Sequence, residues 1–126
     1  MNQRITLGLT LLAGVAIGAT AIHGVGAQGK APGAYAVVDI TEVTDPEAFK
    51  QIIPIAGPAA ENAGGKYIVR TDKIASLDGT PPKRFVVIAF DSVDKAKAWN
   101  ASEEQKKVDA IRVKTTKSRV FIVEGM

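Results

Sequence analysis

The sequence predicts an α+β fold in which a four-stranded antiparallel sheet carries its helices on one face. Segments rich in β-branched and aromatic residues alternate with helical segments in the order βαββαβ. Capping residues stand where the helices should begin, and a chain of 126 residues has room for one domain. In a single small domain this order folds as a split βαβ sandwich, the ferredoxin-like topology.

The N-terminal segment has the parts of a secretory signal peptide. Arg4 supplies a positive charge, residues 5–22 are uncharged, and Val25 and Ala27 are the small side chains that signal peptidase accepts before its cut. We therefore expect a signal peptide at residues 1–27, cleaved after Ala27, and an exported protein, periplasmic or secreted. The alternative is an uncleaved segment that anchors the chain in a membrane, but glycines and threonines dilute its hydrophobicity.

The first half of the domain follows a short linker. Residues 28–33 have the composition of a flexible leader, and the ferredoxin-like domain is expected over residues 34–126. Residues 34–43 form the first predicted strand. Asp45 can cap the helix that follows, and two internal prolines should kink or split this helix near Gly57.

The second half supplies three strands and the remaining helices. Gly64-Gly65 should end the first helix through a left-handed C-cap. Ser92 should open the second helix, and Ser102 with Gln105 has the form of a capping box for a further helical stretch. The strands are expected at residues 66–71, 84–90 and 119–124, with a loop containing Asp78-Gly79 after the first of them.

Both faces of the predicted sheet are apolar. In residues 84–90, Phe85 and Val87 point to one face while Val86 and Ile88 point to the other. Helices on one side can cover only one face, and a small domain should not leave the other in water. We expect a homodimer packed sheet face to sheet face. The less favoured alternative is that residues 72–82 fold over the second face.

The reactive side chains exclude several chemistries. The chain has no cysteine, and its single histidine, His23, lies inside the predicted signal peptide. The mature domain would therefore lack Ser-His-Asp and Cys-His catalysis, histidine-ligated haem and the usual zinc sites. We expect no metal and no cofactor. The 99 residues after Ala27 carry 15 basic and 13 acidic side chains, too even a balance for a nucleic-acid-binding surface.

Several segments in register resemble one known family. They are Asp45-Pro46-Glu47-Ala48-Phe49, Ala56-Gly57-Pro58, residues 64–70, residues 82–90, Ala96-Lys97-Ala98-Trp99, Ile111-Arg112 and Val123-Glu124-Gly125. Together they are similar to the domain of unknown function 1330 family, within the dimeric α/β-barrel (ferredoxin-like) superfamily. The resemblance spans residues 34–125. It implies the fold and a dimer, and it implies no reaction.

The chain departs from this family pattern at three places. Family members commonly carry a histidine where Ala63 stands and an aromatic residue where Asn100 stands, and they tend to have a larger acid at Asp78. If that histidine takes part in chemistry in relatives, this protein lacks it. The case for an enzyme is weaker for that reason.

Five residues are candidates for a ligand-binding cleft between helices and sheet: Arg70, Tyr67, Trp99, Arg112 and Asp78. The planar fork of Arg70 could hold a ligand carboxylate, or it could pair with Asp39 or Asp78, which is the more common structural role. Arg112 is either directed to the same cleft or solvated on its helix. Trp99 is more often a core residue than a ligand platform.

Three functions fit these features, in order of preference. The first is a homodimeric module that binds a small anionic or aromatic molecule. The second is a cofactor-independent enzyme of the monooxygenase or isomerase type, by analogy of fold alone. The third is a structural or stress-related exported protein. No catalytic residue is identified, no nucleic acid is expected, and a membrane is involved only if the signal segment is not cleaved.

Overall fold

The computed structural model describes residues 33–126. Its elements are β1 (Ala34–Val43), α2 (Pro46–Phe49), the 3-10 helix η1 (Lys50–Ile52), α3 (Ile53–Asn62), β2 (Lys66–Thr71), β3 (Arg84–Phe90), α4 (Val93–Ala101), α5 (Glu103–Thr115) and β4 (Thr116–Glu124). The predicted signal peptide, and all of the leader except Gly33, lie outside the described residues. Within residues 33–126, no helix is long and apolar enough to cross a membrane.

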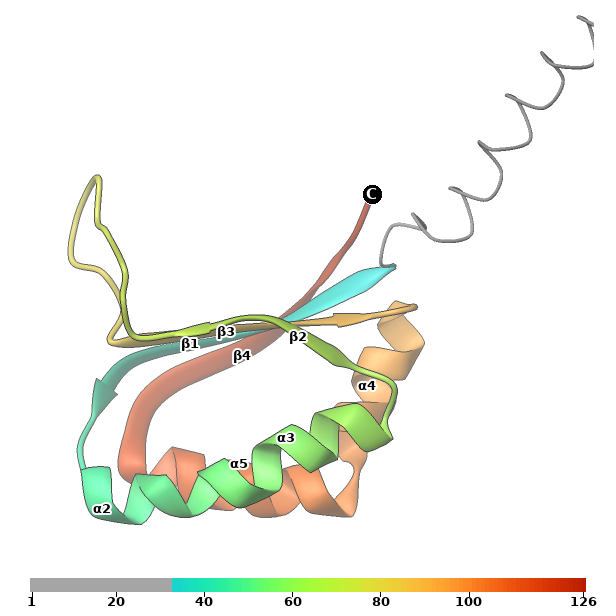
Figure 1. The fold of residues 1–126 in the computed structure, drawn as a ribbon, viewed down its shortest axis with the longest axis horizontal. Coiled ribbons are helices and arrows are strands. Elements are labelled where there is room, and N and C mark those ends of the chain that lie inside the picture. Colours follow the sequence, from blue (N-terminus) through green and yellow to red (C-terminus); the bar gives the residue numbers. More distant parts are fainter. Residues whose placement is uncertain (1–32) are drawn as a thin grey trace, which may run out of the picture. The chain divides into compact units, whose positions relative to one another are not determined.

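The four strands form one antiparallel sheet in the order β2-β3-β1-β4. The helices lie on one face of this sheet (Figure 1). This arrangement confirms the predicted ferredoxin-like α+β fold. β4 begins at Thr116 rather than at Arg119, because its first residues continue the pairing with the end of β1, where Val43 opposes Thr116.

The first helical segment is divided, but not where the sequence predicted. Asp45 caps α2 by accepting a hydrogen bond from the Ala48 N–H at 3.2 Å, as expected. The division lies at η1 and not near Gly57. Pro54, at the start of α3, has no N–H to donate to the carbonyl four residues earlier, so the preceding turn tightens into a 3-10 helix.

Two glycines end α3 and let β2 approach the core. Gly64 has a φ of +86°, and it donates to the Glu61 carbonyl while Gly65 donates to the Ala60 carbonyl. These two bonds form a Schellman motif, which confirms the predicted C-cap. A Cβ on Gly65 would lie 2.7 Å from the Phe90 ring, so this position has no room for a side chain.

The remaining helices begin at the serines named by the sequence. Ser92 accepts from the Lys95 N–H and Ser102 accepts from the Gln105 N–H. The reciprocal half of the predicted capping box is missing, because the Gln105 amide donates to Asp109 instead. Gln105 is thereby directed inward and is buried.

The core lies between the sheet and the helices. Ile88 and Phe90 on β3 pack with Ala36 on β1 and with Trp99 on α4. The Phe90 and Trp99 rings have centroids 5.5 Å apart and are tilted by 38°. Trp99 is 2% exposed, so its predicted structural role is confirmed.

The opposite face of the sheet, here called the outer face, is apolar and uncovered by helices (Figure 1). Val87 on β3 opposes Val37 on β1 and Val69 on β2, and Val37 opposes Phe121 on β4. Phe121 and Val123 are 41% and 42% exposed. Residues 72–83 form a loop that rises from one end of the sheet (Figure 1), and its Leu77 is fully exposed. The alternative in which this segment covers the outer face is therefore wrong.

Candidate functional site

A cavity of about 300 Å³ lies between the helices and the inner face of the sheet. The sheet contributes Val38, Ile40, Val86 and Ile88, and the helices contribute apolar side chains that include Phe49, Ile52 and Val108. Its polar lining comes from Tyr67, Arg70, Arg84, Gln105 and Arg112, together with the indole of Trp99. A mostly apolar cavity with a few convergent polar groups is the usual form of a small-molecule site.

A β-bulge brings Tyr67 and Arg70 to the same face of β2. In a regular strand, residues three apart point to opposite faces. Here Tyr67 opposes Ile88, Val69 opposes Val87 and Arg70 opposes Val86, so the register shifts by one residue at Ile68. The Arg70 guanidinium carbon consequently lies 4.7 Å from the centroid of the Tyr67 ring. The bulge thereby places a cation at the cavity.

Arg84 is a cavity residue that the sequence analysis did not identify. It is half-buried at the start of β3, and it shares a face with Val86 and Ile88, which also line the cavity. Among the described residues, neither Arg84 nor Arg70 forms an ion pair or a side-chain hydrogen bond. The expected pairing of Arg70 with Asp39 or Asp78 is wrong, since Asp39 pairs with Arg119 at 3.0 Å. The alternation of side chains along β3 could have identified Arg84, because it places this residue on the same face as Val86 and Ile88.

Tyr67 is fixed in the cavity wall as a neutral hydroxyl. Its Oη donates to the Ala56 carbonyl on α3 at 2.9 Å. Burial raises the pKa of the Tyr67 hydroxyl above its ordinary 10.0, with the positive charges of Arg70 and Arg84 opposing this rise and the negative charge of Glu61 adding to it. At neutral pH the group therefore stays protonated.

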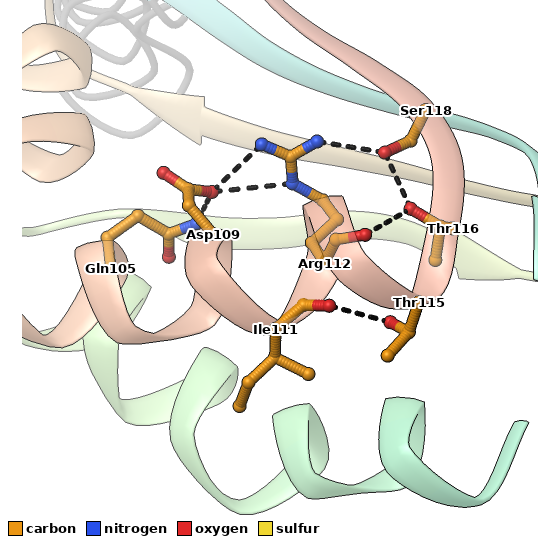
Figure 2. Close-up of polar contacts among 7 residues, drawn as sticks. All are labelled: Gln105, Asp109, Ile111, Arg112, Thr115, Thr116 and Ser118. Carbon is orange, nitrogen blue, oxygen red and sulfur yellow. Dashed lines mark hydrogen bonds and ion pairs between the residues drawn. The ribbon is translucent and has the colours of Figure 1, made fainter. Parts of the chain in front are cut away.

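Arg112 is held by its own helix and by β4. Its guanidinium donates to Asp109 Oδ1, at 3.2 Å from Nη2 and 3.4 Å from Nε, and to Ser118 Oγ at 2.8 Å. Figure 2 shows the guanidinium between these two partners, with Gln105 also donating to Asp109. The Arg112 side chain is only 13% exposed, so the solvated alternative is wrong. Asp109 compensates its charge.

Trp99 and Arg112 also border a second cavity of about 320 Å³, beside β4. The two residues therefore stand in the wall between both spaces. The Trp99 Nε1 atom is buried and has no hydrogen-bond partner among the described residues. A buried donor without a partner is unfavourable by about 1–3 kcal/mol, which is often a sign of a functional constraint.

The structure brings together four of the five candidate residues: Tyr67, Arg70, Trp99 and Arg112 all line the first cavity. Asp78 does not join them. It lies exposed in the loop between β2 and β3, next to Gly79, which has a φ of +77°. The cavity lining contains three arginines and no acidic side chain.

The lining groups of this cavity donate hydrogen bonds and carry positive charge. The arginines are donors, whereas the Tyr67 hydroxyl already donates its one proton to the Ala56 carbonyl and the Gln105 amide donates to Asp109. Within the described residues, no cluster of acidic or histidine side chains has the arrangement of a metal site. The arrangement suits the recognition of an acceptor-rich or anionic group at one end of an apolar space.

An antiparallel sheet in the order β2-β3-β1-β4 with helices on one face defines the ferredoxin-like class of α+β proteins. Within that class, the family model described as "Domain of unknown function (DUF1330)" matches residues 33–126, and the chain belongs to this family. The resemblance noted from the sequence is thereby confirmed. A comparison with curated proteins found no match.

Solved structures with the same fold come from several bacteria. A protein of unknown function from Rhodopseudomonas palustris has a TM-score of 0.59 and 14% identity, covering 79% of this chain and 88% of that one. A dimeric ferredoxin-like protein of unknown function from Thermobifida fusca has a TM-score of 0.58 and 16% identity, covering 75% and 92%. A cofactor-independent oxygenase from Streptomyces nogalater has a TM-score of 0.51 and 14% identity, covering 73% and 91%. At these identities the likeness concerns the fold.

Proposed function

We propose that this protein is an exported, homodimeric module that binds a small molecule in the cavity between its helices and its sheet. The observation that carries the proposal is the lining of this cavity: an apolar space of about 300 Å³ bordered by donor groups, two of them unpaired arginines. Arg70 is solvent-exposed and Arg84 is half-buried, and neither pairs with a carboxylate among the described residues, so both guanidinium groups are free to bind the acceptor groups of a ligand.

The second part of the proposal is that the outer face of one copy packs against that of another. A patch that includes Val87, Phe121 and Val123 would be covered in this way, and large exposed apolar patches commonly mark an interface. Support also comes from the Thermobifida fusca protein, which has the same fold and is described as dimeric.

The third part is export, and its support lies in residues 1–27. Their single positive charge, apolar run and small residues before Gln28 are the features of a cleaved signal peptide. An exported binding module would bind molecules that reach its compartment from outside the cell.

A second candidate function is a cofactor-independent oxygenase. The likeness to the Streptomyces nogalater enzyme favours it at the level of fold. The cavity itself favours binding, because its titratable lining groups are three arginines and a tyrosine that burial keeps protonated, and none of these accepts a proton at neutral pH.

Native mass spectrometry of the protein purified from the export compartment tests the three parts together. We expect the mass of a dimer whose chains begin at Gln28. We also expect a small molecule to be bound, either retained from purification or added, so that the peak of the complex grows as the peak of the free protein falls. A monomer that starts at Met1 would contradict the dimer and export. A protein that takes up neither aromatic nor aliphatic small molecules would contradict binding.

A further inference from the structure

We propose that the ligand of the cavity is a small amphiphilic anion, whose head group binds Arg70 and Arg84 and whose apolar body lies along β3 toward Trp99. The proposal rests on the proposed binding function. It adds the charge of the ligand, its orientation and a specificity-determining role for Arg84. Carboxylate and phosphate head groups share the chemistry required, because each presents several oxygen acceptors with negative charge.

The two arginines stand at neighbouring positions of one face. Arg70 on β2 opposes Val86 on β3, and Arg84 lies two residues before Val86 on the same strand. Diagonal neighbours of this kind have Cα atoms roughly 7–8 Å apart, within reach of each other's long side chains. Both arginines and Tyr67 line the first cavity, so the three groups border a common space.

Within residues 33–126, no carboxylate forms an ion pair with either arginine. Asp39 on β1 opposes Phe85, the residue next to Arg84, but strand alternation turns Asp39 to the outer face, where it pairs with Arg119. Glu61 on α3 acts on Tyr67 through its charge, yet it forms no ion pair with Arg70 or Arg84 among the described residues. Two adjacent cations without a counter-ion repel each other, and an anionic head group placed between them removes that repulsion.

Arg112 is not the residue that would bind the head group. Its guanidinium is already engaged by Asp109 and Ser118, so its charge is compensated and its geometry fixed. The unpaired charge of the cavity is therefore confined to the end where β2 finishes and β3 begins. This confinement gives a bound anion one orientation, with its body directed away from Arg84 along β3.

The remaining lining suits a short apolar body. Ile40, Val86 and Ile88 form the floor on the sheet, and Phe49 and Val108 cover it from the helices. From Arg84 to Ile88 the strand extends about 13 Å. A volume of about 300 Å³ is at the lower end of ligand cavities, which limits the body to a single ring or a short aliphatic chain. Trp99 closes the far end of this path.

The test compares three ligands with one ring and different head groups: phenylacetate, phenyl phosphate and the neutral phenylacetamide. Isothermal titration calorimetry of the full chain gives each Kd. Trp99 is the only tryptophan, so a change in its fluorescence reports binding at one of the two cavities that it borders, and the arginine variants below identify the first. We expect at least one of the two anions to bind about 10- to 100-fold more tightly than the amide, the range for a charge-assisted hydrogen bond.

Variants assign this preference to the arginines. We expect Arg84→Gln and Arg70→Gln each to raise the Kd of the anion by about tenfold and to leave that of the amide within about twofold. Lys107→Gln removes one positive charge from an exposed position on α5 outside the cavity lining, and it should leave every Kd within about twofold. Thermal melting confirms that each variant is folded before its titration.

The outcomes separate the two proposals. If the amide binds as tightly as both anions, or if Lys107→Gln weakens anion binding as much as Arg84→Gln, the ligand class is wrong while the binding function stands. If none of the three ligands binds, the ligand class is wrong, and the binding function is then decided by the native mass spectrometry described above. The tighter of the two anions identifies the head group as carboxylate or phosphate.

Discussion

The guanidinium of Arg70 lies over the ring of Tyr67, 4.7 Å from its centroid, although the two residues are three positions apart on one strand. This contact exists because Ile68 is an additional residue in β2 relative to β3. The additional residue exchanges the faces of the side chains that follow it, and the Arg70 side chain therefore lies on the inner face. The ligand-facing end of the cavity thus depends on a local irregularity of the edge strand.

Arg84→Gln should not destabilise the unliganded protein. Arg84 has no ion pair or side-chain hydrogen bond among the described residues, and its charge repels that of Arg70. We expect the free energy of unfolding to stay the same or to rise by up to about 0.5 kcal/mol. Urea denaturation without ligand measures this change. A loss of more than about 1 kcal/mol would mean that Arg84 has a structural partner.

Arg112→Gln should have the opposite effect on stability. The substitution leaves Asp109, whose side chain is 27% exposed, without the cation that contacts it at 3.2 Å. We expect the free energy of unfolding to fall by about 1.5–3 kcal/mol in urea denaturation. The double variant Arg112→Gln with Asp109→Asn should recover part of this loss, since no uncompensated charge remains. Equal losses in the single and double variants would contradict an ionic role.

Tyr67 should make the protein less stable at high pH. Because burial raises its pKa in the folded state, the folded protein holds the hydroxyl proton at pH values where the unfolded chain releases it. The contribution is fully present below the unfolded pKa, near 10.0, and it is lost as the pH rises through the folded value. We expect the pH dependence of unfolding above pH 10 to become shallower in Tyr67→Phe. An unchanged slope would exclude Tyr67 as its source.

Gly65→Ala should destabilise the core, whereas Gly57→Ala should not. The new Cβ at residue 65 would lie 2.7 Å from the Phe90 ring and 2.8 Å from Ile88, and we expect a loss of about 1–3 kcal/mol. At residue 57, inside α3, nothing lies within 4 Å, and alanine should stabilise the helix by about 0.5–1 kcal/mol. Thermal melting of the two variants checks both signs.

Phe121→Glu should dissociate the proposed dimer. A carboxylate at residue 121 would replace an exposed apolar ring of the outer face by a charge that dimerisation would have to desolvate. Sedimentation velocity should show a dimer for the wild type and a monomer for the variant. Val113→Glu, at an exposed apolar position on α5, is the control and should remain dimeric. A wild type that sediments as a monomer would reject the outer face as the dimer surface.

Most of the fold could be predicted from local signals. Asp45, Ser92 and Ser102 cap their helices as expected, because a capping hydrogen bond involves only a few consecutive residues. Alternation along β3 separated the inner face from the outer one. The position of the helix division was missed, since the effect of Pro54 falls on the turn before it rather than on the glycine after it.

The site was harder to predict for a physical reason. Tyr67, Arg70, Trp99 and Arg112 line one cavity, and the reason that Arg70 lies on the cavity face of β2 is the bulge at Ile68. No residue type marks such a bulge, because it depends on the register against β3. Asp78 was placed in the cleft although it follows β2 by several residues, and a loop of that length can leave the sheet altogether.

The loop of residues 72–83 starts two residues after Arg70 and ends one residue before Arg84. Its tip is solvent-exposed and its ends are fixed by the sheet, which are the conditions under which proteins tolerate inserted domains. A circularly permuted fluorescent protein spliced near Leu77 would therefore be connected through its two termini to the arginine pair. The fold is in this sense a ready frame for a biosensor, in which a ligand bound at the arginine pair would lie next to the two strand ends through which the reporter is attached.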